Sequence, residues 1–81
     1  MVDISKLKGD ERINFAVEHC YNLYKSESEN NPTSLYCKFM KDGIMAIYKQ
    51  AIPIQCGAIG LFLDENEINK TMSILIDKIA N

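Results

Sequence analysis

The fold depends most on residues 35–50, LYCKFMKDGIMAIYKQ, which carry an Asp-Gly pair at positions 42–43. An Asp-Gly pair between apolar runs favours a two-residue β-hairpin turn, because such a turn needs a positive φ that glycine adopts readily. This turn would pair Met40 with Met45 across the hairpin. One face would then carry Leu35, Cys37, Phe39, Ile44, Ala46 and Tyr48. Apolar residues at a period of two are typical of a half-buried antiparallel sheet, so we predict a hairpin here.

The same residues have a second interpretation as a helix that begins with Asn31 as its cap and Pro32 in its first turn. One side of that helix would carry Tyr36, Met40, Ile44, Ile47 and Ala51. Gly43 would then lie in the helix interior, where glycine costs about 1 kcal/mol. We therefore favour the hairpin and keep an all-α small bundle as the alternative.

Two amphipathic helices are predicted on either side of this stretch. The first spans residues 10 to about 25, and its apolar stripe comprises Ile13, Ala16, Val17, Cys20 and Tyr24. Residues 26–34, SESENNPTS, contain no large apolar side chain and are predicted to form a loop. The last helix follows Asp64, which forms a capping box with Glu67. Its apolar stripe comprises Ile68, Met72, Leu75, Ile76 and Ile79.

Residues 51–63 predict a third strand, with Pro53 near its start or on an edge and Gly57 or Gly60 at a bulge. The order helix, hairpin, strand, helix then predicts an α+β fold. In this fold two helices cover one face of a three-stranded antiparallel sheet. We expect residues 1–81 to form a single domain, with residues 1–9 as a polar lead-in.

Charge and composition argue against several classes of partner. Nine Lys/Arg and eleven Asp/Glu give a net charge of −2, whereas binding to a phosphate backbone requires a basic surface. No apolar run is long enough to span a bilayer, and residues 1–10 do not resemble a signal peptide. The three cysteines include no C-x-x-C pair, which predicts buried thiols without a disulfide framework. We expect a cytoplasmic protein that binds neither nucleic acid nor membrane.

Residues with catalytic or metal-binding chemistry are few. His19, Cys20, Cys37 and Cys56 are formally enough for a zinc site, but none forms the closely spaced pair that such sites use. His19 and Cys20 are adjacent on a helix and diverge by about 100°. The sequence has no P-loop, no G-x-S-x-G and no G-x-G-x-x-G motif. We therefore predict no enzyme, no metal and no cofactor.

The predicted binding surface is the outer face of the hairpin, which the two helices would leave uncovered. It carries apolar and lysine side chains: Tyr36, Lys38, Met40, Met45, Ile47 and Lys49. Phe15, which projects away from the apolar stripe of the first helix, is a further candidate. A small chain gains stability when such a face is buried. We therefore hypothesise a non-catalytic protein-interaction module, an inhibitor, adaptor or accessory subunit, that forms a homo-oligomer or binds another protein.

The alternative hypothesis is an oligomeric protein that binds a small anionic ligand such as a nucleotide. Tyr36 or Tyr48 would stack on a ring of the ligand. Lys38, Lys41 or Lys49 would meet its anionic group.

Overall fold

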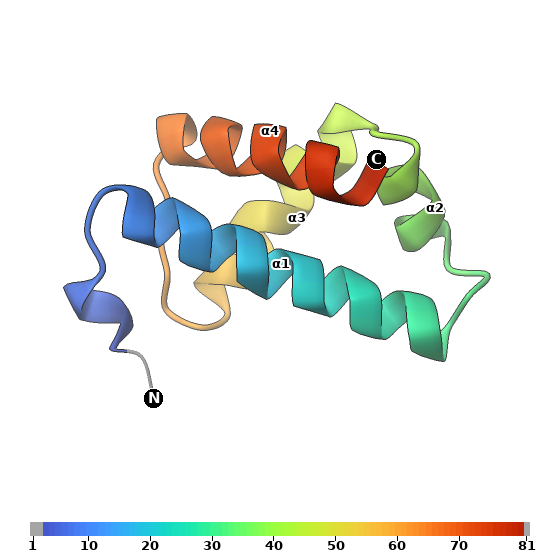
Figure 1. Cartoon of the computed structure of the whole chain (residues 1–81), viewed down its shortest axis with the longest axis horizontal. Coiled ribbons are helices and arrows are strands. Elements are labelled where there is room, and N and C mark those ends of the chain that lie inside the picture. Colours follow the sequence, from blue (N-terminus) through green and yellow to red (C-terminus); the bar gives the residue numbers. More distant parts are fainter. Residues whose placement is uncertain (1–2, 81) are drawn as a thin grey trace.

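The computed structural model describes residues 3–80. The chain forms a short 3₁₀-helix, η1 (Ile4–Lys6), followed by the α-helices α1 (Asp10–Asn30), α2 (Leu35–Lys41), α3 (Met45–Gly57) and α4 (Glu65–Ala80). α1 and α4 lie side by side and run in the same direction, with α3 behind them and α2 near the end of α1 (Figure 1). No strand occurs within residues 3–80. The predicted α+β fold and its three-stranded sheet are therefore wrong, and the chain adopts the all-α alternative.

The Asp-Gly pair ends α2 and does not form a hairpin turn. Gly43 has the expected positive φ of 74°, but Asp42 has a φ of −75°, whereas a type I′ turn needs positive φ at both residues. The Gly43 N–H donates to the Met40 carbonyl at 3.1 Å, and the Ile44 N–H donates to the Phe39 carbonyl at 3.2 Å. These two bonds form a Schellman motif, which also requires a residue with positive φ. The same dipeptide therefore suits a hairpin and a helix end.

The predicted third strand is divided between the second half of α3 and the turn that follows it. Pro53 lies inside α3, where a proline costs about 3 kcal/mol because it lacks an N–H. Tyr48, Ile52 and Cys56 follow one another at helical spacing, and all three are fully buried. Burial of a large apolar side chain contributes about 1.5–3 kcal/mol, so the helical face outweighs the proline. Gly60, with a φ of 84°, lies in the turn after α3 and is not a bulge residue.

α1 continues through residues 26–30, which were predicted as a loop. Polar residues do not prevent a helix, and Pro32 is the first residue here that does. The N–H of Asn31 still donates to the Glu27 carbonyl, at 2.7 Å. Ser34, and not Asn31, caps α2 by accepting a hydrogen bond from the N–H of Cys37.

The predicted apolar stripes of the first and last helices are confirmed as parts of the core. Buried residues come from all four α-helices and the turn after α3: Ile13, Ala16, Val17, Cys20, Met40, Tyr48, Ile52, Cys56, Leu61, Met72, Leu75 and Ile79. Tyr24, Ile68 and Ile76 are partly buried against this cluster. Ile4, from η1, also packs on the core. The predicted polar lead-in therefore makes at least one apolar contact within residues 3–9. Residues 1–2 of the lead-in lie outside the described range.

The predicted capping box at the start of α4 is confirmed. The Glu67 N–H donates to Asp64 Oδ1 at 2.8 Å, and the Asp64 N–H donates to Glu67 Oε1 at 3.0 Å. Arg12 Nε donates to Glu67 Oε2 at 2.8 Å, and this bond lowers the pKa of the Glu67 carboxyl. Arg12 also donates to the Phe62 carbonyl. These bonds hold the start of α1 against the start of α4.

Candidate functional site

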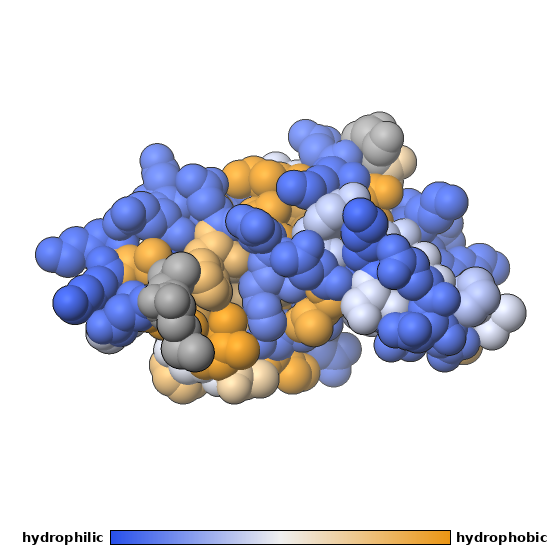
Figure 2. Space-filling model, turned by 60° about the horizontal axis from the view of Figure 1, so that its bottom comes forward, coloured by the Kyte–Doolittle hydropathy of each residue, from blue (hydrophilic) through white to orange (hydrophobic). Residues whose placement is uncertain are grey.

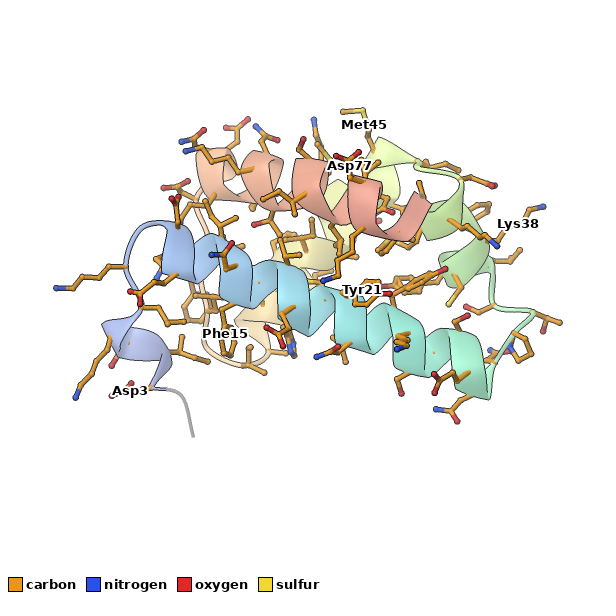
Figure 3. All side chains as sticks on the ribbon, viewed as in Figure 1. Asp3, Phe15, Tyr21, Lys38, Met45 and Asp77 are labelled. Carbon is orange, nitrogen blue, oxygen red and sulfur yellow. The ribbon has the colours of Figure 1, made fainter. Side chains whose placement is uncertain are left out.

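Most of the residues predicted to bind a partner do not share a surface. Met40 is fully buried in the core, while Met45 and Lys49 are exposed on α3. Phe15, Lys38 and Met45 project from three different parts of the molecule (Figure 3). The outer hairpin face on which the prediction rested is therefore not formed, because residues 35–50 are helical.

Two of the predicted residues, Tyr36 and Ile47, do lie together in an apolar groove between α2 and α3. This groove, which we call the α3 groove, has a volume of about 330 Å³ and is lined by Tyr36, Ile47, Gln50, Ala51, Ile54 and Gln55. The predicted binding surface did not include the other four lining residues, Gln50, Ala51, Ile54 and Gln55. The spacing of Ile47, Ala51 and Ile54, which is i, i+4, i+7, is the signal that a helical interpretation provides for this face.

Hydrogen bonds fix one wall of the α3 groove. Gln55 Nε2 donates to the phenolic oxygen of Tyr36 at 2.9 Å, which connects α3 with α2. Burial raises the pKa of the Tyr36 phenol, and the bond from Gln55 opposes this shift in part. His19 Nε2 lies 3.2 Å from the Gln55 carbonyl oxygen, which connects the same turn of α3 with α1. The groove is therefore built on elements that other contacts already hold in place.

Two apolar side chains in or after the second half of α3 are strongly exposed, and one of them lines the α3 groove. Ile54 is 65% exposed, and Phe62, whose ring lies close to Gly57 near the end of α3, is 76% exposed. On the face shown in Figure 2, hydrophobic residues gather in the middle and along the lower edge, whereas both ends are mostly hydrophilic. No charged side chain lines the groove, and Lys49 is the only charged residue of α3. This surface is suited to contact with another apolar surface.

A second, polar hollow lies between the end of α1 and α2. It has a volume of about 310 Å³ and is lined by Tyr24, Ser28, Pro32, Thr33, Ser34, Cys37, Lys38 and Lys41. No carboxylate is part of this lining. Within residues 3–80 the ion pair found is Arg12–Glu67, so neither Lys38 nor Lys41 is paired with a carboxylate there. Two lysine side chains and four residues with hydroxyl groups line the hollow, a combination that suits an anion.

The three cysteines and Tyr48, which carry reactive or ligand-stacking side chains, are packed in the interior. Cys20, Cys37 and Cys56 are buried thiols, as predicted. Tyr48 is fully buried and donates its hydroxyl hydrogen bond to the Met40 carbonyl, so the prediction that it stacks on a ligand is wrong. Across the described part of the chain, no group of three or more His, Cys, Asp or Glu side chains is arranged to hold a metal ion. None of its helices is both long enough and apolar enough to cross a membrane.

The fold and the α3 groove define a small four-helix protein with an uncharged apolar surface. Comparisons with protein-family models, curated proteins and solved structures give no match to this chain. A proposal for its function therefore depends on the geometry of the two hollows.

Proposed function

We propose that this chain is a non-catalytic protein-interaction module that self-associates through the α3 groove. The observation that carries this proposal is the uncharged groove whose lining includes the strongly exposed side chain of Ile54. Buried apolar area is the main source of binding free energy at protein interfaces. The three buried thiols support a reducing compartment such as the cytoplasm.

A second copy of the chain suits this surface for two reasons. First, a two-fold axis places the same surface of each copy against the other, and here that brings no like charges together because the groove lining is uncharged. Second, each copy offers both a hollow and a protruding side chain, so that Ile54 of one copy can enter the groove of the other. A standard interface takes about 800 Å² from each partner, roughly one-seventh of the 5290 Å² surface of this chain.

Substitution Ile54→Glu tests the proposal. Ile54 is exposed, so the monomer accommodates the carboxylate, whereas an interface would bury it without a partner. We expect the dissociation constant of the dimer to rise at least about thirtyfold, the effect of a side chain that contributes 2 kcal/mol to an interface. Size-exclusion chromatography with light scattering over a range of concentrations measures this. Ile47 is less suitable for the test, because it packs partly against the core.

Ile74→Glu is the matched control, since Ile74 is 45% exposed on α4 and does not line the groove. It should leave the dimer unchanged. A wild-type chain that remains monomeric at millimolar concentration would contradict self-association. A dimer that Ile54→Glu does not weaken would place the interface elsewhere and would contradict the role of the α3 groove.

The polar hollow supports a second candidate function, the binding of a small phosphate-bearing molecule. Lys38 and Lys41 both line it, and no carboxylate competes for them there. Adenosine monophosphate or inorganic phosphate at about 100 times its Kd should stabilise the fold by ~2.7 kcal/mol, seen as a rise in Tm. Lys38→Gln with Lys41→Gln should remove this rise, and Lys49→Gln, outside the hollow, should retain it. An unchanged Tm of the wild type with both compounds would exclude this candidate.

A further inference from the structure

Two of the three buried thiols are in contact with each other. Cys20 Sγ in α1 and Cys56 Sγ in α3 are 3.8 Å apart, and both residues are fully buried. Cys37 is engaged elsewhere, because its Sγ lies 3.9 Å from the Tyr24 carbonyl oxygen. The Cys20–Cys56 contact joins two helices that are separate in sequence.

We propose that Cys20 and Cys56 are a redox-active pair that hydrogen peroxide converts into an intramolecular disulfide joining α1 to α3. A disulfide has an S–S length of about 2.05 Å, so the two sulfur atoms must approach by about 1.8 Å. Cys56 is the residue before the last one of α3, and the turn with Gly60 follows it directly. The Cys56 carbonyl accepts hydrogen bonds from the N–H groups of Ile59, at 3.1 Å, and Leu61, at 2.9 Å, so the approach has to come mainly from rotation of the two side chains and not from a backbone shift.

The hydrogen bond between the thiols makes the two sulfur atoms unequal. The bond from Cys20 lowers the pKa of the Cys56 thiol, although burial opposes this shift. The same bond, together with burial, raises the pKa of the Cys20 thiol. The thiolate is the nucleophile, and we assign Cys56, which accepts this bond, as the thiol that attacks the oxidant.

The reaction has two steps. In the first, the Cys56 thiolate attacks one oxygen of hydrogen peroxide, the O–O bond breaks, and the departing hydroxide combines with the proton that Cys56 has released and leaves as water. Cys56 is then a sulfenic acid. In the second, Cys20 Sγ attacks the sulfenic sulfur, the S–O bond breaks, and hydroxide leaves with the Cys20 proton as a second water. The protein loses two hydrogen atoms, and the peroxide is reduced to two molecules of water.

The size of the oxidant matters because neither sulfur is exposed. Hydrogen peroxide is small and uncharged, so a small opening at the end of α3 admits it, whereas a bulky thiol reagent requires wider unfolding. The disulfide would close a long loop between residues 20 and 56, and such a cross-link restricts the unfolded chain. It would also hold α3, the helix that carries the α3 groove, against α1.

The test is peroxide oxidation of the full chain under native conditions, followed by intact mass, peptide mapping and a thermal melt. We expect the loss of two hydrogen atoms, a peptide that contains Cys20 linked to Cys56, and a rise in Tm of about 10 °C or more. Dithiothreitol should reverse all three changes. Cys37→Ser should behave like the wild type, and Cys56→Ser should lose no hydrogen atoms.

Other results would overturn the proposal. They are the addition of oxygen atoms without a cross-link, a disulfide that includes Cys37, and a disulfide between two chains. The Cys37→Ser variant retains the pair in contact, so it provides a decisive result even if Cys56→Ser fails to fold. The outcome does not depend on the oligomeric state, because a chain that is always monomeric can still form this cross-link.

Discussion

Replacing Tyr48 by alanine should lower the free energy of unfolding by about 3–5 kcal/mol, the cost of removing a large aromatic side chain from a core. Tyr48 is fully buried in α3, and its hydroxyl donates to the Met40 carbonyl in α2. A chain of this size has a total stability of about 4–12 kcal/mol, so this loss is a large share of it. Urea denaturation, monitored by circular dichroism, measures the change in the free energy of unfolding.

Tyr48→Phe separates the ring from the hydroxyl. It should cost about 1 kcal/mol, the net contribution of one hydrogen bond, because the ring still fills its place. A Tyr48→Ala variant as stable as Tyr48→Phe would contradict the burial of the ring. If Tyr48→Ala does not fold, the free energy of unfolding of Tyr48→Phe still measures the contribution of the hydroxyl hydrogen bond.

The same side chain predicts a pH dependence. Burial raises the pKa of the Tyr48 phenol to about 12, whereas an unfolded chain has a tyrosine pKa of about 10. The folded state therefore favours the neutral phenol, and its contribution to stability is complete below pH ~10 and is lost as the pH rises from ~10 to ~12. Tyr48→Phe should lose less stability than the wild type over this interval. Equal losses in the two proteins would contradict the shift.

Gly43→Val should lower the free energy of unfolding by about 1–3 kcal/mol, because Gly43 has a φ of 74° that a β-branched residue rarely adopts. The cost arises from the backbone and not from a collision. A Cβ at this position would have Ile76 Cγ2 as its nearest neighbour, at 4.0 Å. Denaturation of the wild type and the variant in parallel measures the difference, and both should give helical circular dichroism spectra.

Gly43→Asn is the matched variant, since asparagine tolerates a positive φ better than other residues with a side chain. We expect it to cost less than Gly43→Val. If both substitutions lower the free energy of unfolding equally, the positive φ of Gly43 is not the cause of the loss.

The α3 groove contains only part of the binding surface that was predicted from the sequence. Tyr36 and Ile47 were predicted to share a surface, and they do, but across a groove between two helices and not along a strand. Ile54 was missed because Pro53 beside it made residues 51–63 resemble an edge strand. Met40 was predicted to be on the surface because residues alternate across a strand, whereas in α2 it faces the core.

The sequence by itself determined the elements whose signals lie within one or two turns of helix. The apolar stripes of α1 and α4 and the box formed by Asp64 and Glu67 were predicted, because helical spacing and capping depend on neighbours in the chain. The burial of the three thiols was also predicted from their number and spacing.

Only the tertiary structure decided the conformation of residues 35–63. The Asp-Gly pair suits a hairpin turn and a Schellman motif, since both use a glycine with positive φ. Pro53 opposes a helix locally, but Tyr48, Ile52 and Cys56 are buried together only if residues 45–57 are helical. Their burial against α1 and α4 is a property of the packed chain. The free energy gained by this burial exceeds the local cost of the proline, and for this reason the middle of the chain folds as two helices.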